Sequence, residues 1–397
     1  MIKILHLFNE YLPKTENWAH QLIAHCEDIE HFIAAQYYNH LDQFSSGVTL
    51  LNKSSGLAKM KRAKQSQYDF PRNVLGGLLS LPSMAAPEKS IAALVKKHDI
   101  DIIHCHFGTT AIEQWEAIKD IELPLVISFY GWDYAKAIHV NPSYKSQYEV
   151  IFQKTSLLLT EGQAGAERLQ ALSAKKEQIQ TLPLGIKINT EDQLLSNRIF
   201  KSGDKLRLVQ IASIAEKKGQ LITLRAFHKI LRKYPDQVSL TLVGDSRDIY
   251  YAEDVMDLMG HQDMKDHVTH IDWIDSKKIN TFLQDFDVFI HPSQYASDGD
   301  CEGGSPVILL QAQATGQPVI STHHCDISEQ VSHGHSGYLA PEGDAGAIVD
   351  IIELFINMSE DHYRQMSAQA VEWVKENFDV KDMGKRLREY YSIVNKS

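Results

Sequence analysis

The residues best suited to chemistry lie between His291 and Thr322, in the stretch HPSQYASDGDCEGGSPVILLQAQATGQPVIST. Gly303 and Gly304 let a ligand approach the backbone closely, and the residues after them favour the start of a helix. Ser305 is a favourable N-cap residue, and Pro306 suits the first helical turn. The N-terminus of a helix binds anions, because its backbone N–H groups and its dipole both favour negative charge. We therefore predict a diphosphate site at this turn.

Polar side chains flank the expected helix, which spans residues 306–315 and ends before a glycine. Glu302 is expected to accept hydrogen bonds from sugar hydroxyls, and Gln311 is expected to reach a ribose or the edge of a base. Two alternatives stay open. The glycines could form an ordinary strand-to-helix turn without a ligand, and Asp298, Asp300 and Glu302 could gather a divalent cation, which prefers oxygen ligands.

A pair of lysines lies in the segment VQIASIAEKKG, between an expected strand and an expected helix. Lys218 is expected to neutralise the charge that develops on a leaving nucleotide diphosphate, and Lys217 lies beside it. Lysines at the start of a helix are also common as solvated side chains, so that alternative stays open.

Two segments in the first half, IIHCHFG and SFYGWDY, contain the ends of expected strands and the residues just after them. Parallel α/β sheets place their ligands at this edge. His106 is therefore expected to face the cleft. The alternatives are a structural histidine with satisfied hydrogen bonds, or a zinc ion bound by His104 and His106.

The elements that must position these residues alternate short β-branched runs with longer helical periods, which indicates parallel sheets with crossover helices. Leu224, Phe227 and Leu231 have the spacing of one helical face. The expected strands are Ile2–Phe8, Ile102–His106, Leu125–Phe129, Ser156–Thr160, Leu206–Ala212, Ser239–Val243, Val288–His291 and Pro318–Thr322. Two doubly wound α/β domains facing a central cleft follow from this pattern.

The domain boundary is expected near residues 183–202, which mix turn formers and charges. We predict an N-terminal acceptor-side domain over residues 1–190 and a C-terminal nucleotide-sugar domain over residues 191–378. A polar helix is expected over residues 379–397, and the sequence leaves open on which domain it packs.

Length and composition agree with this organisation. A chain of 397 residues with 43% hydrophobic and 23% charged residues is ordinary for two globular domains. The four cysteines lack paired spacing, and the N-terminal segment is predicted to be a strand and not a signal peptide, so we expect a cytoplasmic protein. A net charge of −11 argues against binding of nucleic acids.

One basic cluster between Lys53 and Arg72 interrupts the acidic chain. It is interpreted either as a solvated loop or as a patch that meets anionic lipid or a diphosphate-linked acceptor. The second interpretation predicts peripheral association with the inner face of a membrane.

The segment EGGSPVILLQAQATGQPVI resembles the signature of family 4 glycosyltransferases, E-G-x-G or E-G-x-P followed by L-L-E-A-x-A-x-G-x-P-V-I. Lys218 matches the lysine of the family's G-R-L-x-x-x-K-G loop. Two positions depart from the family: Gln311 replaces the glutamate that typically binds the ribose, one residue further from Glu302 than usual, and Ser213 replaces an arginine.

Further matches extend the resemblance over most of the chain. LTLVGDSRD, around Gly244, is similar to the glycine turn of the nucleotide domain, and FDVFIHPS is similar to the strand before the signature. CDISEQVSHGHSGYLAPEGD places Glu329, Gly337 and Asp344 at recurring family positions.

The N-terminal half resembles relatives of the exopolysaccharide type. Tyr130 and Asp133 occupy the H-G-x-D motif, with a phenol in place of the histidine. The segment with Thr15, Glu16 and Asn17 resembles the acceptor-side motif P-x-x-[ST]-E of these relatives, although helix capping explains the threonine equally well.

The resemblance implies a GT-B fold and retaining transfer of a sugar from a nucleotide diphosphate to a saccharide or lipid-linked saccharide, without a required metal or cofactor. Catalytic roles are assigned to Glu302, Lys218 and Asp133 on this resemblance, and to His106 from its position at the end of its strand. The substitutions at Ser213, Gln311 and Tyr130 motivate an alternative, a catalytically silent protein that binds sugar nucleotides. A nucleotide-sugar epimerase or a phosphorylase on the same fold is a further alternative.

Overall fold

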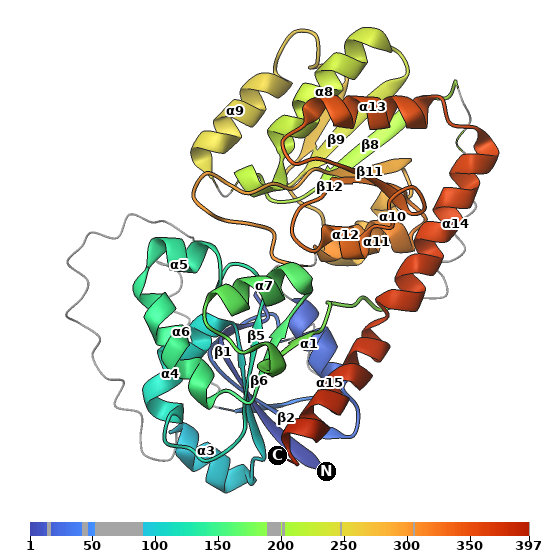
Figure 1. Cartoon of the computed structure of the whole chain (residues 1–397). Coiled ribbons are helices and arrows are strands. Elements are labelled where there is room, and N and C mark those ends of the chain that lie inside the picture. The colour runs from blue at the N-terminus through green and yellow to red at the C-terminus, as the bar shows by residue number, and fades with distance from the viewer. Residues whose placement is uncertain are drawn as a thin grey trace.

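The computed structural model describes residues 1–13, 17–41, 47–51, 90–188, 200, 203–246, 248–304 and 306–396. Two parallel sheets with helices on their faces form two domains, one above the other (Figure 1). The strand order is β3-β2-β1-β4-β5-β6-β7 in the first domain and β10-β9-β8-β11-β12-β13 in the second. Both orders reverse next to the first strand of their domain, as in doubly wound folds, and ligands bind such sheets at the carboxyl ends beside that reversal. The predicted fold class is confirmed.

The N-terminal domain contains the strands β1 (Ile2–Tyr11), β2 (Ile29–Tyr38), β3 (Thr49–Leu51), β4 (Ile102–His106), β5 (Leu125–Phe129), β6 (Leu157–Thr160) and β7 (Ile179–Thr181). Its helices are α1 (Asn17–Ala24), α3 (Ile91–His98), α4 (Gly108–Ile118), α5 (Lys136–Val140), α6 (Ser143–Lys154), α7 (Gln163–Ala171) and the 3-10 turn η2 (Lys176–Gln178).

The C-terminal domain contains the strands β8 (Leu206–Ile211), β9 (Val238–Val243), β10 (Val268–Ile271), β11 (Val288–His291), β12 (Val319–Thr322) and β13 (Gly337–Ala340). Its helices are α8 (Gln220–Lys233), α9 (Ile249–Met259), α10 (Ile279–Leu283), α11 (Val307–Ala314), α12 (Ile327–Gln330), α13 (Ala345–Ile356) and α14 (Glu360–Asn377), with 3-10 turns at η4 (Glu216–Lys218) and η5 (Ser276–Lys278).

Burial explains why these segments adopt their structures. Every residue of β4, β5 and β11 is buried, as expected for parallel strands covered on both faces by helices. The apolar face of α8, which includes Leu224, Phe227 and Leu231, is buried in the core of the C-terminal domain. The expected helix after the glycines begins at Val307 and not at Pro306, which instead serves as its N-cap residue.

The C-terminal helix α15 (Val380–Val394) returns to the N-terminal domain, which answers the question that the sequence left open (Figure 1). Leu387 and Tyr391 pack in a buried cluster with Ile4 and Val126 of the N-terminal sheet. The chain crosses between the domains twice, near Ile186 and near residue 379, and these crossings pair as an isolated parallel bridge. The expected boundary at residue 190 falls outside the described residues.

Helix length and polarity leave no membrane-spanning candidate in the part of the chain that the structure describes. The basic cluster from Lys53 to Arg72 lies outside that part, so its predicted contact with anionic lipid stays a prediction.

Candidate functional site

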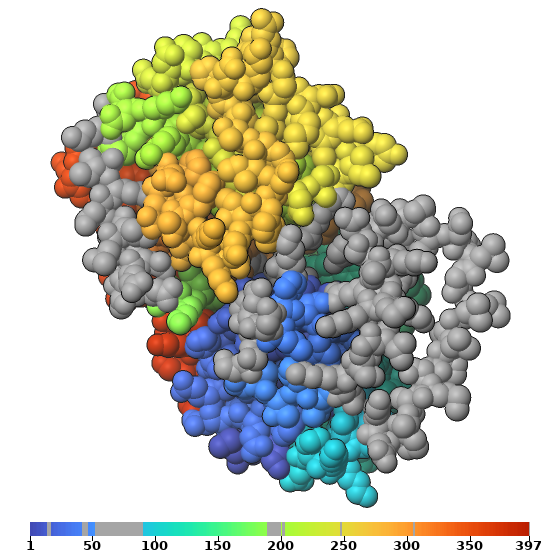
Figure 2. All heavy atoms as spheres, turned by 180° about the vertical axis from the view of Figure 1, so that it is seen from behind, coloured from blue at the N-terminus to red at the C-terminus, as the bar shows by residue number. Residues whose placement is uncertain are grey.

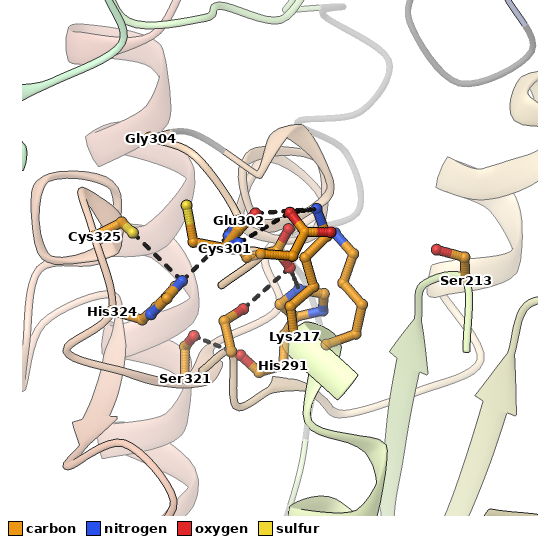
Figure 3. Close-up of polar contacts among 12 residues, drawn as sticks. Ser213, Lys217, His291, Cys301, Glu302, Gly304, Ser321, His324 and Cys325 are labelled. Atoms are coloured by element: carbon orange, nitrogen blue, oxygen red, sulfur yellow. Dashed lines mark hydrogen bonds and ion pairs between the residues drawn. The ribbon is translucent and has the colours of Figure 1, made fainter. Parts of the chain in front are cut away.

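The carboxylate of Glu302 organises a buried charged network at the glycine turn, between β11 and α11. One oxygen accepts hydrogen bonds from His291 Nε2 at 2.7 Å and from Ser293 Oγ at 3.2 Å. The other oxygen forms an ion pair with Lys218. The side chain of Glu302 is only 2% exposed, so these partners replace water around its charge (Figure 3).

Electrostatics keep this network charged. Burial acts to raise the pKa of Glu302, but Lys218 and His291 outweigh it and hold the pKa well below its usual range. Burial lowers the pKa of His291, although its bond to the carboxylate acts in the opposite direction. Glu302 is therefore an anion at neutral pH with its two oxygens already committed.

The neighbouring Lys217 is held in the same way. Its ammonium group donates to Asp300 Oδ1 at 3.1 Å and to the carbonyl oxygen of Cys301 at 3.0 Å. Burial acts to lower the pKa of Lys217, but Glu302 and Asp300 raise it above the ordinary value. A diphosphate that reached these lysines would have to replace carboxylate partners.

The same pairing bears on the cation alternative. Asp298 accepts from Lys136 at 2.6 Å, and Asp300 lies 3.8 Å from the same lysine. With Glu302 paired to Lys218, all three carboxylates are neutralised by lysines. The arrangement does not fit a divalent cation bound by the three carboxylates.

The two domains touch at a pair of glycines. A Cβ atom on Gly131 would lie 2.2 Å from Gly303 Cα, and a Cβ atom on Gly303 would lie 2.5 Å from the carbonyl oxygen of Tyr130. Both glycines have positive φ, 100° and 76°. Only glycine fits these positions, so the loop after β5 rests directly on the predicted diphosphate turn. In the space-filling view the C-terminal domain, yellow-green to orange, sits on the blue N-terminal domain (Figure 2).

Carboxylates cross this contact in both directions. Glu161 of the N-terminal domain accepts a hydrogen bond from the backbone N–H of Gly304 at 2.5 Å. In return, Asp326 accepts from Ala164 N at 2.6 Å and Glu329 from Gln163 N at 3.0 Å, both at the N-terminus of α7. The closed arrangement therefore places a carboxylate on an N–H group that the sequence assigned to a phosphate.

Asp133, predicted as catalytic, is fully buried in the structure. Its carboxylate accepts from Gly108 N at 2.9 Å and from Tyr130 N at 3.1 Å. Burial raises the pKa of Asp133 to about 6, while these backbone donors act to lower it. This geometry lets Asp133 fix the Tyr130 loop to the start of α4, and any catalytic effect would pass through that loop.

His106 does not face the cleft, contrary to expectation. It is fully buried behind Tyr130, whose hydroxyl lies 2.9 Å from His106 Nδ1. The other ring nitrogen lies 2.9 Å from His6 Nδ1. The reason is that β4 is central in its sheet, so a side chain in it is covered on both faces.

The remaining candidates lie around this centre. Ser213 lies apart from the Glu302 carboxylate (Figure 3), next to Gly244, where a Cβ atom would lie 1.8 Å from Ala212 O. Gln311 is half-buried on α11, and Asn17 begins α1. Thr15, Glu16 and Ser305 lie outside the described residues.

Three residues at the site were not singled out from the sequence: His291, Glu161 and Asp326. His291 ends the strand before the signature, so its position at a carboxyl strand end was an available signal. Glu161 follows β6 in the same way. Asp326 gave no such signal, because its partner lies in the other domain.

Comparison with known proteins agrees with this geometry. Residues 192–373 match the family Glycosyl transferases group 1. The chain is 29% identical over 277 residues to the amylovoran biosynthesis glycosyltransferase AmsK of Erwinia amylovora, covering 69% of this chain and 64% of that protein. It is 28% identical over 304 residues to the putative colanic acid biosynthesis glycosyltransferase WcaL of Salmonella typhimurium, covering 72% and 69%.

The fold is shared with the Anabaena protein HepE, solved in complex with UDP, at a TM-score of 0.71 and 17% identity over 98% of this chain and 100% of that one. The match of residues 192–373 covers the glycine turn, the lysine pair and the Glu302 network. Residues 192–373 therefore carry the match to the group 1 glycosyl transferases, and the chain has the GT-B fold.

Proposed function

We propose that the protein is a retaining glycosyltransferase of exopolysaccharide biosynthesis, which moves a sugar from a nucleotide diphosphate to a saccharide or lipid-linked saccharide. The observation that carries the proposal is the Glu302 network, which places a glycine turn, two lysines and a helix start at the strand ends that face the other domain. The names of the relatives AmsK and WcaL support the exopolysaccharide class.

Donor binding requires an exchange of partners. The diphosphate would take the N–H groups of Gly303 and Gly304 together with the start of α11, which follows Pro306. Ser305, predicted from the sequence as a further donor-binding residue, is kept in this proposal. The diphosphate would displace Glu161 from Gly304 and draw Lys218 from Glu302, so the Gly131–Gly303 contact has to open. The nucleoside is assigned to Gly244, Ser213 and Gln311, and the complex of HepE with UDP supports a uridine nucleotide.

In this reaction the protein has two tasks, to position the donor and the acceptor and to stabilise the charge of the leaving diphosphate. The acceptor oxygen bonds to the anomeric carbon as the bond from that carbon to the phosphate oxygen breaks, and the acceptor proton passes to the departing phosphate. Lys217 and Lys218 stabilise the diphosphate as its charge grows. Asp133 holds the Tyr130 loop in place, and the acceptor is assigned to the segment of Thr15, Glu16 and Asn17. The proposal requires no metal and no further cofactor.

The experiment is a thermal-shift screen of UDP-, GDP- and ADP-sugars, followed by a transfer assay with the donor that stabilises the chain. Lys218→Ala should abolish the shift, because it removes the cation that is paired with Glu302 beside the glycine turn. Lys229→Ala is the matched control, since this exposed lysine lies on α8 in the same domain. The proposal fails if no donor stabilises the chain, or if Lys218→Ala shifts with the donor as the wild type does.

A catalytically silent binding protein is the second candidate, and the departures from the family pattern at Ser213, Gln311 and Tyr130 motivate it. This candidate predicts a thermal shift with nucleotide sugars but no release of nucleotide with any acceptor. Turnover above the uncatalysed rate would exclude it.

A further inference from the structure

Four buried histidines cluster on the neighbouring strands β1, β2 and β4 of the N-terminal sheet: His6, His31, His104 and His106. Both ring nitrogens of each have a hydrogen-bonding partner in the structure. Three of the histidines form one chain. It runs from the carbonyl oxygen of Cys26 through His31, His6 and His106 to the hydroxyl of Tyr130.

The direction of every bond in this chain follows from its inner end. A carbonyl oxygen only accepts, so His31 Nε2, 2.9 Å from Cys26 O, carries its proton. Burial lowers the pKa of His31, so the ring is neutral and its Nδ1 is an acceptor. His6 Nε2, which lies 2.9 Å from that nitrogen, must therefore be the donor.

The same reasoning gives the direction of the next two hydrogen bonds, between His6 and His106 and between His106 and Tyr130. Burial holds the pKa of His6 and of His106 well below the ordinary value, so both rings are neutral. His6 Nδ1 is then an acceptor, and His106 Nε2 donates to it across 2.9 Å. His106 Nδ1 is left as an acceptor, so the hydroxyl of Tyr130 donates to it, also across 2.9 Å.

Close packing opposes a flip of the His106 ring, which would move its nitrogens away from His6 and Tyr130. The His106 ring lies 4.2 Å from the ring of Phe8, nearly parallel, and 4.1 Å from the ring of His104. Rotation of a ring packed this closely against two others would push these neighbours apart. The proton of Tyr130 is therefore directed inward, and its oxygen can act toward the cleft only as an acceptor.

We propose that this histidine relay fixes Tyr130 as a hydrogen-bond acceptor for a sugar hydroxyl bound between the domains, and that His31, His6 and His106 are positioning residues acting through it. Tyr130 is suited to this task because it is half-buried and its backbone touches Gly303. The sugar contact rests on the proposed transferase function, whereas the order of the relay does not.

A metal ion is the competing explanation for the cluster. Ring nitrogens of His6, His104 and His106 lie within 4.8 Å of one another, close enough for one ion. However, His104 is engaged by Tyr391 at 2.6 Å and by Ser128 at 2.8 Å. An ion bound by one nitrogen of each ring would replace one of the two bonds of His104 and at least one bond of the chain through His6 and His106, so the relay and the ion exclude each other.

The first test reads the protons directly, by long-range proton–nitrogen correlation NMR of the full chain labelled with 15N-histidine. His31, His6 and His106 should each carry one proton, on Nε2, and added ZnCl2 should leave their signals in place. A proton on Nδ1 of any of the three, a doubly protonated ring, or displacement of the signals by zinc would overturn the relay.

The second test breaks the relay at its inner end, far from any substrate. His31→Gln keeps an amide donor for Cys26 O and an acceptor for His6, and should preserve the Nε2 proton of His106. His31→Leu removes both and should give a mixture of tautomers at His6 and His106. His20→Leu is the control, because His20 is equally buried and lies 2.6 Å from the hydroxyl of Tyr11, outside the relay. In His20→Leu the signals of His31, His6 and His106 should stay unchanged. If His31→Gln and His31→Leu gave the same spectra for His6 and His106, the proposal would be contradicted.

The third test reads the sugar contact by calorimetry with UDP, GDP, UDP-glucose, UDP-galactose, UDP-N-acetylglucosamine and GDP-mannose. For the sugar nucleotide that binds best, Tyr130→Phe and His31→Leu should weaken binding about fivefold, the worth of one neutral hydrogen bond. UDP or GDP alone should bind within about twofold of wild type, and His31→Gln should behave as wild type.

If the hydroxyl belongs to the acceptor saccharide, these affinities stay constant and the acceptor KM rises about fivefold instead. The sugar contact is wrong if neither quantity changes in Tyr130→Phe. If no nucleotide binds the wild type at all, the transferase proposal and the sugar contact fail together, while the tautomers still decide the relay.

Discussion

The loop of Glu302 and the histidine relay are both buried polar networks beside the same domain contact, but one is charged and the other is neutral. Around Glu302, burial is outweighed by Lys218 and His291, and the carboxylate stays ionised. Around His6, burial dominates and holds the ring neutral. A charged network can bind an anion by exchanging partners, whereas a neutral, directed one can only present a donor or an acceptor. At the contact between the domains, the C-terminal domain therefore contributes charged groups and the N-terminal domain contributes neutral hydrogen-bonding groups.

The largest effect should come from breaking the charged network. Lys218→Met leaves the carboxylate of Glu302 buried without its cation, and we expect the free energy of unfolding to fall by about 3 kcal/mol. The measurement is urea unfolding of the full chain. The double variant Lys218→Met/Glu302→Gln removes the unpaired charge and should recover at least half of the loss. Equal losses in the single and double variants would show that the pair is not electrostatically coupled.

Breaking the neutral network should cost less. His6→Leu leaves a donor on His106 and an acceptor on His31 without their partners, and we expect a loss of about 2 kcal/mol in the same urea experiment. The comparison between the networks would be contradicted if this loss equalled or exceeded that of Lys218→Met.

The sequence predicted β1, β4 and β5 of the first sheet and β8 and β11 of the second to within a few residues, because strands buried on both faces are near-continuous apolar runs such as LVISF. It missed β13, four residues that begin with a glycine, and β10, with the sequence VTHI, which lie at the sheet edge, where pairing with a neighbour and not the sequence pattern decides the structure. It also missed the ten-residue β2, which lies inside the first sheet.

The residues of the site also fall into those predicted from local sequence and those decided by contacts between distant residues. Glu302 and Lys218 were predicted from local motifs, and the structure brings them together in one ion pair. The position of His106 depends on His6, which lies 100 residues away in the chain. The contact of Glu161 with Gly304 joins residues 143 positions apart. No local pattern contains such partners, so the burial and the direction of these bonds emerge only in the folded chain.

A smaller effect should follow from removing the carboxylate that occupies the glycine turn. Glu161→Gln weakens the bond to Gly304 N, because a neutral acceptor binds an N–H group less strongly than a carboxylate. We expect UDP to bind about fivefold more tightly, measured by calorimetry. Glu177→Gln is the control, an exposed carboxylate in the same domain whose loss changes the net charge equally. Unchanged or weaker binding in Glu161→Gln would show that Glu161 does not compete with the diphosphate.

The smallest effect concerns pH and the reciprocal contact of Asp326 with α7. Burial raises the pKa of Asp326 to about 6, so the folded chain holds this proton more tightly than the unfolded chain does. The contribution to stability is fully present below the ordinary carboxyl pKa and is lost as the pH rises through about 6. Between about pH 7.5 and about pH 5.5, wild type should gain about 0.8 kcal/mol relative to Asp326→Asn.

Urea unfolding of wild type and of Asp326→Asn at both pH values gives this difference. Asp326→Asn serves as the control, because its amide keeps an oxygen that can accept from Ala164 N but does not titrate. Histidines titrate in the same range in both proteins, so their contribution cancels. A difference of the opposite sign would mean that Asp326 is ionised more easily in the folded chain. In that event the contact across the cleft would be a charged network like that of Glu302, and closure would weaken on acidification because its charge-assisted bonds to α7 would be lost.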